Sequence, residues 1–335
     1  MSVFAVEHCS FTPSKAVIYN KLYTYSPDMG VLPFRGIGST LPTVNKQKGK
    51  ISNRSARRLK DKVNWLVFKS KKQKVKYPNG TISENFRISF ITLTLPSQQK
   101  HSDIEIKRVF NNFLTTLRKR YNMTDYVWKG ELQKNQNIHF HLTTNIFIHH
   151  ATIRTLWNNC INRLGYISEY QSHFSNMTFE EYKSLRLRNA KKSNSTISEE
   201  DIIKAYNDGN KNNWSNPNST DVKTVFNVKN LAAYLAKYLS KKTAKNEESP
   251  AMQKRIKDFG GNIWYCSRSL SKLSSYKTVL CNQYHSFLHK LINLKSTIIK
   301  QYDYCTVLYF DLSKIPKALA VPLTRLLFQY ISVSV

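Results

Sequence analysis

The chain has 335 residues, 41% of them apolar, so it can form one large domain or two modest ones around a buried core. Its 52 Lys and Arg residues against 21 Asp and Glu residues give a formal net charge of +31, which indicates a polyanionic partner, either nucleic acid or an anionic membrane. The five cysteines form no Cys-x-x-Cys pair, and no secretory signal or apolar run of about 18 residues is visible, so we expect no disulfide framework, cysteine zinc site or membrane span.

The N-terminal part of the chain divides into two regions of different composition. Residues 1–45 carry proline and glycine with little periodicity, so we expect a loosely structured arm. Residues 46–76 are strongly basic, and within them 52–68 predicts an amphipathic basic helix. This helix either lies along a phosphate backbone or is a solvated surface helix. Its apolar residues near helical spacing are Leu59, Val63 and Leu66.

The next part of the chain shows the clearest order. The segment 85–96 is rich in β-branched and aromatic residues and stops at a proline, which predicts a strand. Ser102 and Glu105 form a capping box ahead of apolar residues at helical spacing, which predicts the start of a helix. Two further strands, 126–132 and 138–148, flank a polar turn, so we expect a β-hairpin.

The second half of the chain is more varied. Residues 165–220 are polar with two expected short helices, and we interpret this region as an insertion over the sheet. Residues 220–243 predict a short strand followed by an Ala/Leu/Lys helix. The expected domain plan is therefore an arm at 1–45, a main domain at 46–245 and a smaller unit of unknown role at 246–335.

The clearest local pattern is the pair His139 and His141, which stand two residues apart in the expected hairpin, so their side chains share one face. With the turn centred near residue 135, Glu131 lies opposite His139, where cross-strand Cβ atoms are about 4.5–5.5 Å apart. The sequence therefore predicts a two-His, one-carboxylate metal site suited to Mg²⁺ or Mn²⁺. The alternative is a pair of strand histidines on a solvent-exposed face.

A second pattern lies in 231–241, which predicts a helix that carries Tyr-x-x-Lys twice, one turn apart. A leucine stripe of this helix would pack on the sheet and leave the tyrosines and lysines at the border with solvent. A phenol is a weak nucleophile with a pKa of about 10, and nearby ammonium groups and a metal-polarised phosphate favour its attack on phosphorus. Border residues without chemistry are the alternative. The candidates are Tyr234, Tyr238, Lys237 and Lys241.

Taken together, these motifs resemble those of the rolling-circle replication initiators of the HUH endonuclease superfamily, over residues 50–275. The third motif resembles the two-tyrosine form found in initiators of small icosahedral single-stranded DNA phages. The matching segments, in the family's order, are 90–96 (FITLTLP), 137–142 (NIHFHL) and 234–241 (YLAKYLSK). Two further segments that resemble initiators of such phages and related plasmids are 128–133 (WKGELQ) and 264–268 (WYCSR).

The resemblance implies an α+β fold, in which a central antiparallel sheet of ferredoxin/RRM-like topology has flanking helices. It implies that His139 and His141 bind the metal, with Glu131 as third ligand. Tyr234 or Tyr238 would attack origin DNA, which leaves a 5′-phosphotyrosine and a 3′-hydroxyl primer, and the other tyrosine could make the second cut. The lysines at 237 and 241 would orient phosphate or assist proton transfer.

The resemblance also implies single-stranded origin DNA, a host helicase and a host polymerase as partners, and the cytoplasm of a bacterial host as the location. A relaxase and a tyrosine transposase share this chemistry, but a relaxase usually has its tyrosine before the histidines and such a transposase is usually shorter. A non-catalytic basic nucleic-acid-binding protein is the alternative from another class. The sequence contains no Walker-type loop, so we expect no fused helicase.

Overall fold

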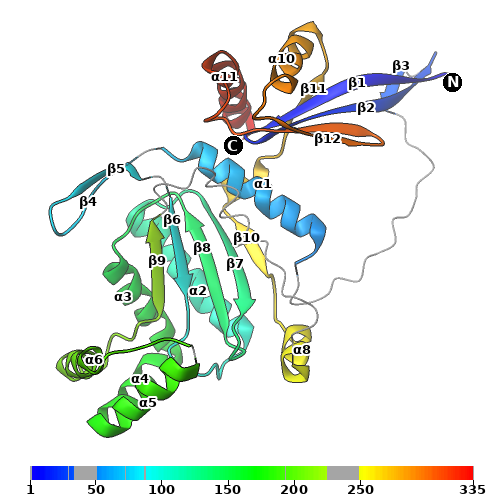
Figure 1. Ribbon diagram of the computed structural model, residues 1–335. Helices are drawn as coiled ribbons and strands as arrows, with labels where there is room; N and C mark the ends of the chain where they lie inside the picture. The colour runs from blue at the N-terminus through cyan, green and yellow to red at the C-terminus, as the bar shows by residue number, and fades with distance from the viewer. Residues whose placement is uncertain are drawn as a thin grey trace.

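The computed structural model describes residues 2–28, 30–33, 51–71, 73–86, 88–192, 194–224 and 249–334. Over these ranges the fold is α+β, with a five-stranded sheet, a six-stranded sheet and a separate two-stranded hairpin (Figure 1). All strand pairings in the three sheets are antiparallel. The α+β class expected from the sequence is therefore confirmed.

The five-stranded central sheet has the strand order β10-β7-β8-β6-β9. Helix α2 (Asp103–Tyr121) connects β6 to β7, and α3 (His150–Ile161) follows β8. Along the chain these elements give a β-α-β-β-α-β succession, with the later helices α4–α6 inserted before the last strand and β10 added at the edge. The strands are β6 (Ser89–Leu93), β7 (Tyr126–Leu132), β8 (Ile138–Thr144), β9 (Thr220–Thr224) and β10 (Trp264–Cys266).

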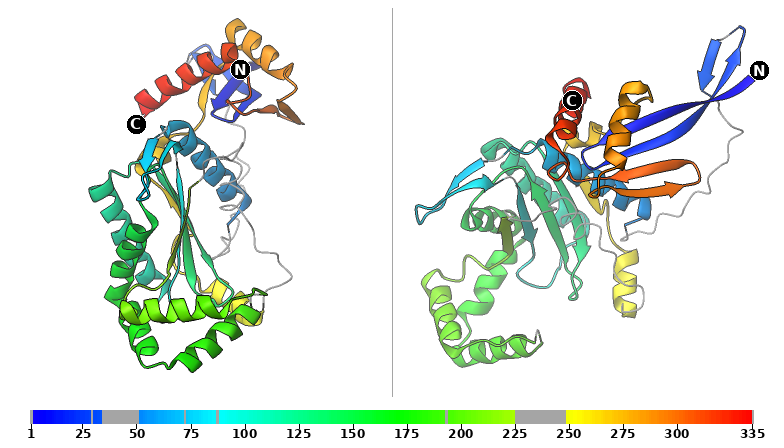
Figure 2. Two further views of the ribbon diagram at one scale, coloured as in Figure 1. Left: turned by 60° about the vertical axis from the view of Figure 1, so that its left-hand side comes forward. Right: turned by 45° about the horizontal axis from the view of Figure 1, so that its top comes forward.

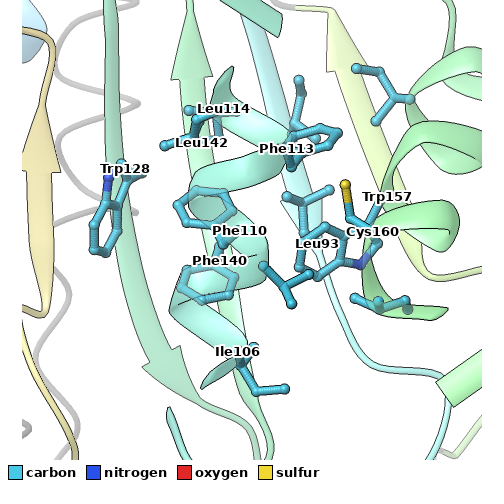
Figure 3. Packing of buried hydrophobic residues seen from close by; sticks show 14 of the residues in the cluster. Leu93, Ile106, Phe110, Phe113, Leu114, Trp128, Phe140, Leu142, Trp157 and Cys160 are labelled. Atoms are coloured by element: carbon cyan, nitrogen blue, oxygen red, sulfur yellow. The ribbon is translucent and has the colours of Figure 1, made fainter. Parts of the chain in front are cut away.

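One face of the central sheet is covered by α2 and α3 (Figure 2, left). Aromatic rings from both layers meet there, and the ring centroids of Phe110 and Phe140 lie 4.1 Å apart with nearly parallel planes (Figure 3). Trp128 and Trp157 pack edge-on against this stacked pair. Their burial fixes which side chains of β7 and β8 point inward, because successive strand residues alternate between the two faces.

The capping box expected from Ser102 and Glu105 is present at the start of α2. The Ser102 hydroxyl accepts from the Glu105 backbone N–H, and the Glu105 carboxylate accepts from the Ser102 backbone N–H. Just beyond it, Asp103 is buried and accepts from the Arg255 guanidinium and from the Gly260 backbone N–H at 3.0 Å. This ion pair fastens the start of α2 to α8 (Pro250–Lys257) and the loop that follows it.

The basic helix expected within 46–76 is α1 (Asn53–Lys69). Its apolar stripe is fully buried, so α1 belongs to the core on one side, and only its other side is solvated. The stripe packs in one cluster with Phe90, Val127 and Cys266, which cap the upper part of the open face of the central sheet. The lower part of that face carries the polar residues described below. The exposed basic residues of α1 include Arg54, Arg57, Arg58 and Lys60.

The loosely structured arm expected at 1–45 is wrong for its first 26 residues. Strands β1 (Ser2–Thr12) and β2 (Lys15–Ser26) form a long hairpin at the centre of the six-stranded sheet, in the order β11-β1-β2-β13-β12. A hairpin gains stability from further strands and a packed face, and here both come from the far end of the chain. The other strands are β3 (Gly30–Pro33), which pairs with β2, β11 (Tyr276–Val279), β12 (Ile298–Tyr302) and β13 (Cys305–Tyr309).

The separate unit expected at 246–335 is also corrected. Strand β10 pairs with β7, so this part of the C-terminal region completes the central sheet. The remainder joins β1 and β2, and its helices α10 (Asn282–Ile292) and α11 (Lys317–Ser334) bury apolar residues in the same cluster as α1. The short helix α9 (Arg268–Lys272) follows β10. The chain therefore returns to its own beginning, which composition alone cannot indicate.

The polar region at 165–220 contains three helices, including both that the sequence predicts, and they lie at the end of the central sheet away from α1 (Figures 1 and 2). They do not lie over the sheet as expected, because Tyr182, Ile202 and Trp214 bury one another in a small core of their own. The helices are α4 (Tyr166–Ser175), α5 (Phe179–Lys192) and α6 (Glu199–Lys211), preceded by the 3-10 helix η1 (Asn162–Leu164).

Two strand boundaries differ from those expected. The segment 85–96 is divided between β6 and β5 (Ile82–Phe86), and β5 pairs with β4 (Gln73–Lys76) in the separate hairpin. The second strand of the histidine hairpin ends at Thr144, short of residue 148. Within the described residues, no helix has the length and apolar character needed to cross a bilayer.

Candidate metal centre

The hairpin of β7 and β8 has the register that the sequence predicts. Glu131 lies directly opposite His139, and Lys129 lies directly opposite His141. Because Phe140 points into the aromatic core, its neighbours on β8 must point to the other face of the sheet. The large apolar side chains of α2 thus decide the direction of both histidines.

The three expected ligands meet on this face. Glu131 Oε1 lies 2.9 Å from Nε2 of His139 and 2.9 Å from Nε2 of His141. The ligand atoms of the three residues all lie within 4.8 Å of one another, and the two imidazole centroids are 4.5 Å apart. In the described part of the chain, this is the one group of three or more His, Cys, Asp and Glu side chains with such spacing.

The carboxylate of Glu131 is held in its charged form by its neighbours. Burial by itself raises the pKa of Glu131, but hydrogen bonds with His139 and His141 and the charge of Lys129 outweigh it. The pKa of this carboxyl therefore lies well below its usual range. An ionised carboxylate beside two imidazoles is the protonation state that a divalent cation requires of its ligands.

A second layer of contacts fixes the ring of His141. Its Nδ1 lies 3.2 Å from the Thr92 hydroxyl, which is directly opposite it on β6. The ring of Phe90 stacks on the imidazole with centroids 5.3 Å apart. These two residues lie in the 90–96 segment singled out in the sequence, but no role for either could be given there. The pairing of β6 with β8, which the sequence does not encode locally, supplies it.

Lys129 fixes the carboxylate from the other side. Its side chain is only 3% exposed, and its ammonium donates to Glu131 Oε2 at 2.7 Å. One carboxylate oxygen is thus occupied by the lysine while the other faces the two imidazoles. Lys129 could have been found from the sequence, because the hairpin register places it on the same face as His139 and His141.

The tyrosine helix predicted at 231–241 lies outside the described residues. This applies to all four candidates on it, Tyr234, Lys237, Tyr238 and Lys241. The described range before it ends at Thr224, the last residue of β9, which pairs with Ser89 of β6. Strand β9 is the short strand expected at the start of 220–243, and Asp221 on it is directly opposite Thr92.

Residues 88–243 match the family model of the replication-associated protein ORF2, which covers a little under half of the chain. The matched segment contains the whole Glu131, His139 and His141 cluster, and its range also spans the four residues of the tyrosine helix. This match supports a role in DNA replication and DNA as the partner. No curated protein and no solved structure matches the chain.

Proposed function

We propose that the protein is a rolling-circle replication initiator that nicks and rejoins single-stranded origin DNA through a tyrosine nucleophile. The observation that carries this proposal is the convergence of Glu131, His139 and His141 on one sheet face inside the segment that matches a replication-associated family. A basic protein that only binds nucleic acid needs no such cluster. The β-α-β-β-α-β succession, with its strand order β7-β8-β6-β9, also supports the ferredoxin-like topology expected of HUH endonucleases.

The cluster fits a divalent cation such as Mg²⁺ or Mn²⁺. Neighbouring ligands of an octahedral ion at 2.0–2.1 Å are about 3.0 Å apart. The Nε2 to Oε1 separations of 2.9 Å agree with that spacing. His139 Nδ1 is buried without a hydrogen-bond partner among the residues that the structure describes. When bound, the cation would polarise the scissile phosphate and stabilise charge on its oxygens.

The chain's own residues supply the remaining chemistry. The phenolic oxygen of Tyr234 or Tyr238 attacks phosphorus, the bond from phosphorus to the 3′-oxygen breaks, and that oxygen takes up a proton to become the 3′-hydroxyl primer. The phosphotyrosine conserves the energy of the broken bond, so a later 3′-hydroxyl can reverse the step and close a circle. The ammonium groups of Lys237 and Lys241 orient the phosphate and favour the phenolate.

This function implies particular partners and a location. Origin DNA must be presented as a single strand, because the scissile phosphate has to reach the open side of the ligand cluster. A nicked duplex needs strand separation and extension of the primer, so we propose a host helicase and a host polymerase as partners, in the cytoplasm of a bacterial host. A relaxase or a single-strand transposase would use the same residues on a different DNA target.

The proposal is tested by trapping the covalent intermediate. The full chain, incubated with single-stranded origin DNA and Mn²⁺, is expected to form a protein–DNA adduct that is stable to denaturation, and none in excess chelator. Mass spectrometry should place the modification within 230–242. A protein that binds the DNA equally well with and without chelator, and forms no adduct in either case, would instead be a non-catalytic binder.

The Thr92 hydroxyl gives a finer test of the cluster. The substitution Thr92→Val keeps the shape of the side chain but removes the contact with His141 Nδ1, and we expect Mn²⁺ affinity to fall about 10–100-fold. Titration calorimetry measures this directly. The matched control is Thr143→Val, since Thr143 lies two residues along β8 from His141 and its buried hydroxyl has no hydrogen-bond partner in the described ranges. Equal affinities for the two variants would show that Thr92 does not position the imidazole.

A further inference from the structure

The six-stranded sheet has two faces of different chemistry. One face is apolar and carries Cys9, Phe11 and Leu308, which pack in the main core. The ring of Phe11 contacts Phe287 on α10, which lies over the sheet in the right-hand view of Figure 2. Strand residues of opposite parity form the other face, here called the outer face.

The outer face is rich in aromatic side chains. Phe4 stacks on Tyr23 with centroids 6.0 Å apart, and His8 lies between Tyr19 and Tyr23, stacked on both. Further out, the rings of Tyr25 and Tyr302 are 48% and 52% exposed. Rings with this exposure have one side available to a ligand. By strand register, the aromatic residues of the outer face are Phe4, Tyr19, Tyr23, Tyr25, Tyr302 and Tyr309.

The charges on this sheet are sorted between the two faces. All four lysines of the described strands project to the outer face, and the one carboxylate in these strands, Glu7, projects to the other. Two of the lysines lie near aromatic rings, with Lys21 Nζ 4.9 Å from the ring centroid of Tyr23 and Lys300 Nζ 6.0 Å from that of Tyr309. The four lysines are Lys15, Lys21, Lys277 and Lys300.

We propose that this outer face is a second DNA-binding surface, which holds single-stranded DNA by stacking bases on its tyrosines and neutralising phosphates with its lysines. Exposed aromatic faces interleaved with cations are what an unpaired strand requires, because every base has a free π-face and every linkage carries a negative charge. A duplex hides its base faces and would use only the lysines. The choice of DNA as the polyanion rests on the proposed function, whereas the surface itself is independent of the metal cluster.

The role of such a surface follows from its position in the chain. It is built from β1, β2, β12 and β13, whereas the candidate metal cluster lies on β7 and β8 of the other sheet. A strand held on the outer face would remain attached to the protein whether or not the cluster has cut it. We therefore assign to the outer face the retention of flanking single strand between successive cuts.

The stacking part of the proposal is tested by binding of fluorescein-labelled oligothymidylate to the full chain in chelator, followed by anisotropy. The double variant Tyr25→Leu with Tyr302→Leu keeps apolar bulk but removes the rings, and we expect its affinity to fall about tenfold or more. The double variant Tyr25→Phe with Tyr302→Phe keeps the rings and should bind as the wild type does. Circular dichroism and thermal melting establish that each variant is folded.

The charge part is tested by the salt dependence of the same binding. Replacing Lys21 and Lys300 by glutamine should lower the slope of log affinity against log salt by about 0.7 for each phosphate that is no longer neutralised. The matched control replaces Lys191 and Lys192, exposed residues of α5, by glutamine, which removes the same charge far from the sheet. The proposal predicts a smaller slope for the first variant alone.

The outcomes separate this proposal from the nicking function. Unchanged affinity in the double leucine variant, or an equal loss in the double leucine and double phenylalanine variants, would overturn stacking on the outer face. Equal binding of oligothymidylate and of a duplex of the same length, with all variants affected alike, would also overturn it. If oligothymidylate binding depends on the outer face but no covalent adduct forms on origin DNA, then the nicking proposal fails and the outer-face proposal stands.

Discussion

Replacement of both Tyr234 and Tyr238 by phenylalanine is expected to abolish the covalent protein–DNA adduct while leaving single-strand binding unchanged. Phenylalanine keeps the ring and its packing but has no oxygen to attack phosphorus, so the loss should be complete, below the detection limit of a denaturing gel. The measurement is adduct formation on labelled origin DNA with Mn²⁺, beside anisotropy on the same oligonucleotide.

The two single variants distinguish the roles of the tyrosines. If each tyrosine makes one of two cuts, either single variant should still form an adduct but should fail to release a closed circle. If only one acts, its single variant should match the double variant. The control is Tyr265→Phe, a half-exposed tyrosine on β10 of the central sheet, which should leave the adduct yield at the wild-type level. An adduct that persists in the double variant would exclude both residues as nucleophiles.

The second large effect is expected from the metal ligands. Replacing His141 by alanine removes one of the three groups that meet at Glu131 Oε1, and the cleavage rate should fall about 100–1,000-fold. The same variant should bind Mn²⁺ much more weakly, since two remaining side chains are too few to hold a hard cation firmly. Single-turnover cleavage and titration calorimetry measure the two effects separately.

The control for this prediction is His150→Ala. His150 is exposed at the start of α3 and stacks against His149, so its loss removes an imidazole without touching the ligand cluster. It should cleave at the wild-type rate and bind Mn²⁺ normally. A His141→Ala variant that retained full metal-dependent cleavage would show that the cation is held elsewhere in the protein.

Local sequence signals predict the hairpin and the candidate ligand set. Alternation of apolar and polar residues in 126–132 and 138–144, together with a short polar turn, determines the register, because a slip of one residue would expose Phe140 and bury a histidine. That register alone brings Glu131 to His139. The capping box at Ser102 is equally local, since all of its hydrogen bonds lie within four residues.

The tertiary structure decided what depends on contacts between distant segments. The strand β1 pairs with β11, and β2 with β13, across separations of more than 250 residues, so composition near the N-terminus could not indicate a sheet. The basic helix α1 proved to have a fully buried stripe because the apolar partners that cover it come from both ends of the chain. Thr92 reaches His141 only through the pairing of β6 with β8.

The sequence by itself thus determined the three side chains that could hold a cation, because they belong to one hairpin whose geometry follows from its own residues. Only the tertiary structure decided what surrounds and orients them. The Phe90 ring, the Thr92 hydroxyl and the core beneath the hairpin come from other segments, and those contacts form only when the whole sheet is assembled.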